Sequence, residues 1–552
     1  MSDAIVVGSG INGLVAAAEL AGAGWSVTLV EREERLGGFI ASGERTLPGY
    51  VHDTFSSWHP LFVSGGAYAQ LGEELHRHGL VYRNTDGPLV ASIADDGRAV
   101  VAHRDPERTA EQFGHAEDRG RYLKALQDFL DQAGPVGGLM GAELRSPAML
   151  RHAGGLARGL GRAGTERWLR DLVTSGRSWC AREFTGTEVD QLWVPWLLHA
   201  GLAPDQASGG FLVPVLAATL HGFGPPVVEG GAGRFVEAFR SLLAERGVEI
   251  RTGAPVERIL VDNGRATGVV AGGETLRARR AVVASVTPTA LYGELLPAGS
   301  VPAQVTDEAR RFRYGRAELQ IHVALSAPPH WRDERLREIP LVHVSDGSAG
   351  TGIACAEAEA GLLPARPTIV VGQQYLLDPS RVPAGAASLW LQLQETPFAP
   401  RGDAAGELDT SAGWNPALAQ AYASRVLDRI ARHAPGLRDS VLAVDVITPP
   451  DLTAANPNAV AGDPYGGAAE LDQSFHWRPL PSAAHHRTPV PGLWHIGAST
   501  HPGAGLGGGS GHLVAQSLLT PSRFESTKTA VASWLRGSSQ LPPRRGTPRP
   551  QV

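Results

Sequence analysis

The chain opens with short apolar runs separated by glycine turns. Residues 4–7 (AIVV) have the continuous apolar character of a buried strand, and the alanine- and leucine-rich residues 14–23 are typical of a helix packed on a sheet. A second apolar run, residues 26–30, again has strand character. This order of strand, glycine turn, helix and strand predicts the opening unit of a parallel α/β sheet.

Related patterns return in the middle of the chain. From residue 227, a glycine turn precedes an amphipathic helix at 234–245 and several short strands rich in valine and isoleucine. Residues 319–325 (LQIHVAL) and 387–393 (ASLWLQL) indicate strands of a separate antiparallel sheet, with proline-rich loops between them. The charged segment 106–179 is compatible with helices and broken by glycine turns, so it predicts a helical cap.

The first turn carries three glycines at the spacing G-x-G-x-x-G, namely Gly8, Gly10 and Gly13. In such a turn the first glycine permits the bend, the second lets a pyrophosphate approach the backbone, and the third lets the helix pack closely on the strand. Glu31 follows Gly13 by 18 residues, close to the offset of an acid that bonds a ribose hydroxyl. A second copy of the spacing, at 503–508, follows a His-Pro pair instead of a strand, so we expect the dinucleotide at the first turn.

The C-terminal region supplies a further strand and helix. Residues 493–496 have strand character, Gly497 is a position of close approach, 502–509 form a loop of bare backbone, and 510–519 indicate a helix. We therefore expect an α/β protein with a Rossmann-type cofactor domain assembled from both chain ends and an interleaved substrate domain of antiparallel sheet and helical cap. The expected segments are cofactor-binding 1–105, 226–300 and 481–536, helical cap 106–225, substrate domain 301–480, and a disordered tail at 537–552.

Charge and cysteine content argue against several classes of function. The balance of 50 basic and 56 acidic residues, with a pI of about 6.4, offers no basic field for nucleic acid. Cys180 and Cys355 lie far apart without a C-x-x-C pair, which argues against a disulfide framework, a thiolate metal site and a dithiol relay. Because H-E-x-x-H and comparable clusters are missing, we expect no metal site.

Localisation is predicted from what the sequence lacks. It has no basic leader at the N-terminus and no run of 18 apolar residues, so we expect a soluble, cytoplasmic protein. Apolar stretches such as 192–198 (LWVPWLL) belong to the core or line the entrance for a lipophilic ligand. Peripheral membrane contact therefore stays open.

At the level of whole motifs the chain resembles the FAD-dependent phytoene desaturase-like family, which includes bacterial carotenoid desaturases and one class of carotenoid ketolase. The matching pieces, in order, are VVGSGINGLVAA, EREERLGG, GGAGRFVEAF, VERILVDNGRATGVV, AVVASVTP and GLWHIGASTHPGAGLGGGSG. They cover the cofactor-binding segments from both chain ends. The chain departs from many relatives where Leu506 is followed by three glycines, which implies a more open flavin edge there.

The resemblance implies FAD, not NAD, as the tightly bound cofactor. The implied cofactor-binding residues are Gly8, Gly10, Asn12 and Gly13 at the pyrophosphate, Glu31 at the adenosine ribose, Gly37 and Gly38 in the following segment, Val256 at the adenine through its backbone, and Gly497, Pro502, Gly503 and Ser510 beside the flavin. The helix that begins at Ser510 would direct its N-terminal dipole at the reduced flavin.

The chemistry implied is dehydrogenation of a lipophilic, isoprenoid- or polyene-like substrate by hydride transfer to flavin N5, with the protein supplying orientation and electrostatics. No acid–base dyad stands out, and the polar candidates near the expected flavin are His52, Asp53, His59 and His501. Of these, His59 and His501 are the candidates for a catalytic contact. Two alternatives stay open: a flavin amine oxidase, which should show an aromatic pair beside the flavin, where Trp494 alone is visible, and a non-catalytic flavoprotein scaffold.

Overall fold

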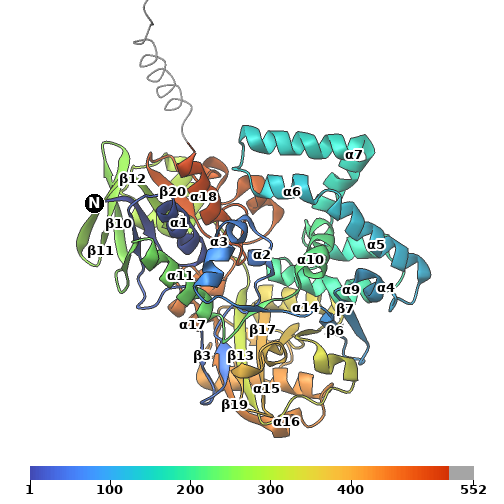
Figure 1. Ribbon diagram of the computed structural model, residues 1–552. Helices are drawn as coiled ribbons and strands as arrows, with labels where there is room; N and C mark the ends of the chain where they lie inside the picture. The colour runs from blue at the N-terminus through green and yellow to red at the C-terminus, as the bar shows by residue number, and fades with distance from the viewer. Residues whose placement is uncertain (521–552) are drawn as a thin grey trace, which may run out of the picture.

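The computed structural model describes residues 1–520, which form two sheets joined side by side and a helical cap (Figure 1). The predicted tail at 537–552 lies outside these residues. Within them, no helix is long and apolar enough to cross a membrane. The α/β class and the Rossmann-type cofactor domain with an interleaved second domain are confirmed.

The first sheet is built from both ends of the chain. Its parallel strands follow the order β20-β12-β1-β2-β9, and the first part of the long strand β12 pairs antiparallel with the hairpin β10-β11. The bounds are β1 Ser2–Val7, β2 Val27–Val30, β9 Glu249–Arg251, β10 Val256–Asp262, β11 Arg265–Ala271, β12 Glu274–Ser285 and β20 Leu493–Ile496. The N-terminal strand thus lies one strand away from the C-terminal one.

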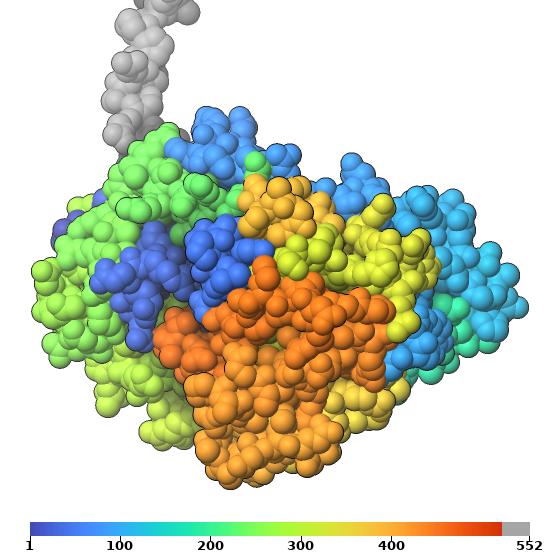
Figure 2. Space-filling view, turned by 90° about the horizontal axis from the view of Figure 1, so that it is seen from below, coloured from blue at the N-terminus to red at the C-terminus, as the bar shows by residue number. Residues whose placement is uncertain are grey.

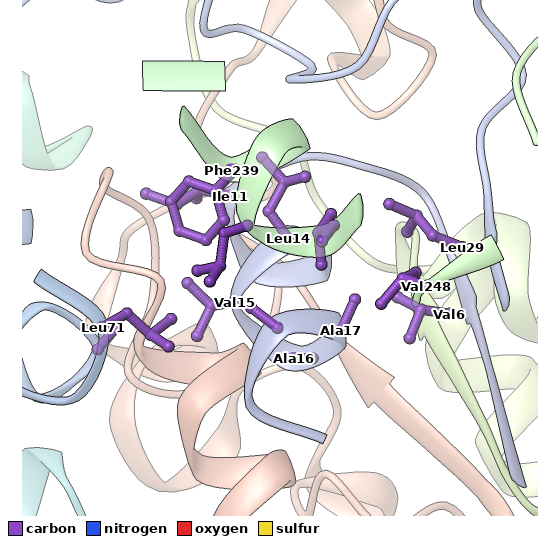
Figure 3. Close-up of a cluster of buried hydrophobic side chains, with 14 of the residues drawn as sticks. Val6, Ile11, Leu14, Val15, Ala16, Ala17, Leu29, Leu71, Phe239 and Val248 are labelled. Atoms are coloured by element: carbon purple, nitrogen blue, oxygen red, sulfur yellow. The ribbon is translucent and has the colours of Figure 1, made fainter. Parts of the chain in front are cut away.

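Four helices cover one face of this sheet: α1 (Ile11–Gly22), α3 (Gly66–Arg77), α11 (Gly233–Glu245) and α18 (Gly509–Leu519). The side chains of α1 point towards the strands on one side and towards α11 and α3 on the other (Figure 3). This helix is alanine-rich because it is buried all round, where small side chains allow close packing. The opposite face packs against the β10-β11 hairpin and α13 (Ala303–Arg310).

The second sheet has the order β19-β13-β17-β16-β14-β6-β7 and is antiparallel except for the β14-β6 pair. Its bounds are β6 Pro88–Ile93, β7 Ala99–His103, β13 Ala317–Leu325, β14 Leu341–Val344, β16 Ile369–Gly372, β17 Ala387–Thr396 and β19 Val441–Ile447. Strands β6 and β7 fall within the segment 1–105 that we assigned to the cofactor domain. Their pairing places them in the substrate sheet, because a short apolar strand does not reveal its partner.

Alternation of side chains gives β13 and β17 two unlike faces. The odd-numbered residues Leu319, Ile321, Leu391 and Leu393 pack against α15 (Pro416–Ala431) in an apolar core. The even-numbered residues are mostly polar and face the other way, towards the cofactor domain and the cap. This polar face becomes part of the functional site.

The helical cap covers the other half of that polar side, over β6, β7, β14 and β16. Its elements are α4 Pro106–Ala110, α5 Ala116–Leu130, α6 Ala133–Met140, α7 Pro147–Val173, α8 Gly176–Glu183, α9 Glu188–Trp193, the 3₁₀ helix η1 Val194–Ala200 and α10 Gly209–Phe223. In Figure 1, α7 lies along the outer edge of the cap. Of the apolar stretch 192–198, Leu192, Trp193 and Leu197 are buried core residues.

A buried ion pair joins the two lobes, that is, the cofactor domain and the second domain. The Arg381 guanidinium donates to Asp53 at 2.7 Å, to Asp378 at 3.1 Å and to the carbonyl oxygen of Val228 at 2.6 Å, and its side chain is 1% exposed. Asp53 ends β4 (Val51–Asp53), which pairs with β3 (Ser42–Glu44). Figure 2 shows this early, blue part of the chain between the green hairpin region and the orange residues of the second domain.

The remaining elements complete the fold. They are α2 Pro60–Val63, β5 Tyr82–Arg83, β8 Val227–Val228, α12 Pro288–Ala290, the π-helical turn η2 Leu291–Leu295, η3 Glu334–Glu338, α14 Gly347–Glu359, β15 Leu362–Leu363, η4 Gln374–Leu376, η5 Pro379–Arg381, β18 Gly402–Asp403, α16 Leu437–Ser440, α17 Pro449–Ala455, and the turns η6 Val460–Gly462, η7 Leu471–Gln473, η8 Phe475–Trp477 and η9 Pro481–Ala483.

Candidate functional site

A cavity of about 300 Å³ lies where the first sheet, the second sheet and the cap meet. One end is formed by backbone at the carboxyl ends of the parallel strands, the place where open α/β sheets bind ligands. The other end is formed by side chains of β13, β17, η1 and α10. The glycines that line it are Gly10, Gly37, Gly38, Gly466, Gly497 and Gly505.

The N-terminal turn has the geometry that its glycines predict. Gly8 has a positive φ of 89°, and a Cβ at Gly13 would overlap the carbonyl oxygen of Gly8, so helix and strand are in close contact here. Gly10 differs, because a Cβ there would meet nothing within 4 Å. Its backbone therefore faces open space at the start of α1, which fits the pyrophosphate of FAD.

Glu31 directly follows β2 and is 8% exposed. Its Oε2 accepts hydrogen bonds from the backbone N–H of Ser9 at 2.8 Å and from the Ser9 hydroxyl at 2.6 Å, and its Oε1 accepts from the N–H of Glu33 at 3.0 Å. The carboxylate thus fixes the glycine turn. A carboxylate can accept about four hydrogen bonds, so it retains capacity for a ribose hydroxyl.

The C-terminal helix meets the N-terminal one beside this turn. The side-chain oxygen of Asn12 accepts from the N–H of Gly511 at 3.1 Å, and a Cβ at Gly511 would overlap the backbone of Asn12. The Ser510 hydroxyl accepts from the N–H of Gly497 at 3.1 Å and lies 2.7 Å from the Thr500 hydroxyl. Both chain ends are therefore needed to shape the cradle.

The predicted cofactor residues fall into two groups. Gly10, Asn12, Gly37, Gly38 and Gly497 line the cavity. The others do not line it: Gly8 and Gly13 lie in the turn, Glu31 follows β2, Val256 begins β10 of the hairpin, and Pro502, Gly503 and Ser510 lie in the C-terminal loop and helix. The N-terminus of α18 contacts Asn12 rather than the cavity, so the proposed dipole effect on the flavin stays a prediction.

The four polar candidates lie outside the cavity wall. Asp53 belongs to the buried ion pair with Arg381, and His52 bonds the Thr46 hydroxyl at 2.9 Å. His59 bonds the Tyr82 hydroxyl at 2.9 Å, and burial lowers its pKa to about 4. The carbonyl oxygen of His501 lies 2.8 Å from the His486 ring, and burial lowers the pKa of His501 to about 4 as well. None of the four side chains contacts the cavity.

The substrate end of the cavity contains a set of polar residues that the sequence analysis missed. Four even-numbered residues of β13 and β17 line it and form what we call the polar floor: Glu318, Gln320, Gln392 and Gln394. Glu318 is 3% exposed, and its Oε2 accepts from the Gln392 amide at 2.6 Å. The Gln394 amide donates to the Tyr465 hydroxyl at 2.8 Å. The floor thus combines one carboxyl with three amides.

Burial raises the pKa of Glu318 from 4.5 to about 7; the side chains of Tyr465 and Gln392 oppose this rise, and the negative charges of the nearby Asp463 and Glu395 add to it. His199 on η1, stacked on Trp196, has a pKa lowered to about 3 by burial. Both shifts favour the neutral form. Among the described lining residues, these two and Tyr465 carry the titratable groups.

Aromatic and aliphatic side chains form the walls above the floor. Trp58, Trp196, Trp390, Leu216 and Leu220 line the cavity. Trp494, the aromatic residue weighed for an amine oxidase, lies on β20 beside a separate hollow with His485 and Arg487. Alternation within ELQIHVAL and SLWLQLQ was a usable signal, because it sets polar residues on one face of each strand.

Comparisons with known proteins agree with this geometry. The family model described as "Flavin containing amine oxidoreductase" matches residues 11–519. The pyridine nucleotide-disulfide oxidoreductase domain-containing protein 2 of Rattus norvegicus is 28% identical, covering 93% of this chain and 92% of its own. Hydroxyneurosporene desaturase of Cereibacter sphaeroides is 27% identical (93% and 97%), and a limonene dehydrogenase subunit of Castellaniella defragrans is 24% identical (94% of each).

Solved structures share the fold. An oxidoreductase from Methanosarcina mazei superposes with a TM-score of 0.60 at 15% identity, covering 94% of this chain and 99% of that one. Putrescine oxidase bound to putrescine gives 0.56 at 16% identity, with the same coverage. The expected FAD cofactor and phytoene desaturase-like resemblance are confirmed. The chain belongs to the flavin-containing amine oxidoreductase family and is an FAD-dependent oxidoreductase.

Proposed function

We propose that the protein dehydrogenates a largely apolar, isoprenoid- or polyene-like substrate. The observation that carries the proposal is a single cavity that joins the glycine cradle to a compartment walled by tryptophan and leucine side chains under the cap. Two relatives whose names state an isoprenoid-related activity, a limonene dehydrogenase subunit and a hydroxyneurosporene desaturase, support this substrate class.

Bound FAD would supply the two-electron acceptor, taking hydride at N5. The residues of this chain then have three tasks. Gly10, Asn12 and Glu31 hold the nucleotide end, and Trp196 and Trp390 exclude water from the reacting carbon atoms. The polar floor fixes how far the substrate enters. Orientation and exclusion of water are the protein's main contributions to such a reaction.

The test uses purified protein with its FAD, mixed without oxygen with limonene, geraniol, an acyclic polyene, and primary amines of similar length. We expect a terpenoid compound to bleach the oxidised flavin absorbance, with an alkene or carbonyl product found by mass spectrometry. Bleaching by the amines alone would replace the proposal with amine oxidation. Protein that binds FAD but is reduced by nothing in the panel would favour a scaffold.

We also propose peripheral contact with anionic membranes through α7. This element consists of two helical segments joined by a kink at Gly161 and buries only Leu156, while Leu150 in the first segment is 72% and Leu169 in the second 52% exposed, with five arginines along the two segments. Exposed apolar residues with a basic face are typical of helices that lie on anionic lipid. Sedimentation with phosphatidylglycerol vesicles should pull down the protein, and the double variant Leu150→Ser/Leu169→Ser should stay in solution.

A further inference from the structure

The polar floor offers a ligand more free hydrogen-bonding groups than an apolar channel needs. Its amide N–H₂ groups are already engaged, since Gln320 donates to the carbonyl oxygen of Phe55 at 2.7 Å, Gln392 to Glu318, and Gln394 to Tyr465. A carbonyl oxygen only accepts, so its contact fixes the orientation of the Gln320 amide. These contacts use one N–H of each amide and one oxygen of Glu318, so the remaining oxygens of the floor are left for other partners.

Three of these oxygens lack a partner in hydrogen-bonding geometry among the described residues: Oε1 of Glu318, of Gln320 and of Gln394, although the nearby Tyr465 hydroxyl interacts with the Glu318 carboxyl closely enough to lower its pKa. Each of the three floor residues is at most 3% exposed. The indole N–H groups of the lining residues Trp196 and Trp390 are likewise buried and unpartnered within residues 1–520. Buried polar groups without partners are unfavourable, so a ligand that supplies both donors and acceptors would be stabilised here.

The cavity lining carries little charge, which favours an uncharged ligand. Burial favours the neutral forms of Glu318 and His199, and the described lining includes no lysine, arginine or aspartate. An ammonium group could donate to the oxygens but would leave the indole N–H groups without acceptors. A carbonyl group could accept from the indole N–H groups but would leave the oxygens of the floor without donors. A hydroxyl group donates and accepts, and it carries no charge that burial would penalise.

We propose that the polar floor binds a hydroxyl group carried on an otherwise apolar molecule, with Glu318 and Gln394 as its specificity-determining residues. The proposal deepens the proposed function and rests on it in taking this cavity as the substrate site. The substrate class would then be a lipophilic alcohol rather than a plain hydrocarbon, held by its hydroxyl group at the floor while its apolar part lies between the tryptophans.

The test compares three probes of equal chain length, 1-octanol, n-octane and octylamine, on the FAD-loaded protein. Dissociation constants come from the flavin difference spectrum and from the shift in melting temperature. At pH 7 we expect 1-octanol to bind at least tenfold more tightly than either of the others. Glu318→Leu should abolish this preference, whereas Glu318→Gln, which like the neutral carboxyl presents one donor group and one acceptor oxygen, should retain it within threefold.

Glu395→Gln is the matched control. Glu395 is also a fully buried glutamate whose pKa is raised to about 7, and it lies on β17, but it accepts from the backbone N–H groups of Thr368 and Gln394 and does not line the cavity. Its variant should keep the preference for 1-octanol. Should Glu318→Leu fail to retain FAD, Gln394→Leu tests the same floor and should lower the preference at least threefold.

Equal affinity for 1-octanol and n-octane would overturn the proposal. So would tighter binding of octylamine that strengthens as the pH rises through 7, since this would identify an ammonium site built on ionised Glu318. Binding needs no turnover, so the result is separate from the proposed function. Protein that prefers 1-octanol but whose flavin no terpenoid reduces would contradict only the proposed dehydrogenation.

Discussion

The two ends of the cavity recognise their ligands by different means. The cofactor cradle consists of bare backbone at glycines such as Gly10 and Gly497, whereas the polar floor consists of long side chains from two paired strands. Recognition by bare backbone is disturbed when a substitution adds atoms. Recognition by side chains is disturbed when a substitution removes their polar groups. The two ends should therefore respond to opposite kinds of substitution, and they function together only while the two lobes stay joined.

Breaking the junction should have the largest effect on stability. Arg381→Met leaves Asp53 and Asp378 buried without a counter-charge, and loss of one partner of a buried ion pair costs about 3–5 kcal/mol. Urea unfolding should show this loss together with loss of FAD. Arg45→Met is the control, because the Arg45–Asp445 pair at the same junction is partly exposed and should contribute less than about 1 kcal/mol. Equal effects would contradict a buried junction.

Substitutions at two glycines of one turn should affect stability and FAD affinity separately. Gly13→Ala forces a Cβ against the Gly8 carbonyl oxygen, so unfolding in urea should require about 3 kcal/mol less. Gly10→Ala has room for its Cβ and an ordinary φ of −60°, so it should fold normally. Its methyl group nevertheless points into the space expected for the pyrophosphate, and FAD affinity should fall at least tenfold. Normal FAD binding by Gly10→Ala would remove the pyrophosphate from this turn.

The neutral carboxyl of Glu318 in the polar floor should make the free energy of unfolding depend on pH. Below pH 4.5 the Glu318 carboxyl is protonated in the folded and unfolded states alike; between 4.5 and about 7 only the unfolded state loses its proton. Stability contributed by the neutral carboxyl is therefore lost as the pH rises through this window. Glu318→Gln should reduce the fall in unfolding free energy between pH 5 and pH 8 by on the order of 2–3 kcal/mol. An unchanged pH dependence would show that Glu318 is ionised in the folded protein.

The cofactor half was predictable because its signals are local. The helix expected at 234–245 is α11, Gly233–Glu245, since Phe235, Ala238, Phe239 and Leu242 recur on one face. The strand expected at 493–496 is β20, and the C-terminal helix begins one residue earlier than expected. Each of these elements is specified by its own residues: periodic apolar positions for the helix and glycines at the turns.

The floor was not predictable in the same way. The strands at 319–325 and 387–393 were correctly expected, yet Glu318 lies one residue before the first of these ranges and Gln394 one residue after the second. Only the antiparallel register, with Gln320 opposite Gln392, brings the four polar side chains together. The histidines near the glycine segments drew attention instead, and these are buried in contacts with Thr46, Tyr82 and His486. Pairing between distant strands is a property of the fold, which no single stretch encodes.

The smallest expected effect concerns Glu31, the cradle residue that acts through its side chain and so tests the contrast between the two ends. Glu31→Ala removes the acceptor of the Ser9 and Glu33 hydrogen bonds and the predicted ribose contact. The ribose contact is one hydrogen bond to a charged group, which contributes about 1.5–3 kcal/mol, so the dissociation constant of FAD, measured by ultrafiltration, should rise about tenfold, at the lower end of that range. Glu249→Ala on the neighbouring strand β9, where the carboxylate bonds Thr28 and Arg251, should leave it unchanged. If Glu31→Ala loosens the turn without weakening FAD, then Glu31 serves the backbone alone, and the cradle recognises its cofactor without any charged side chain.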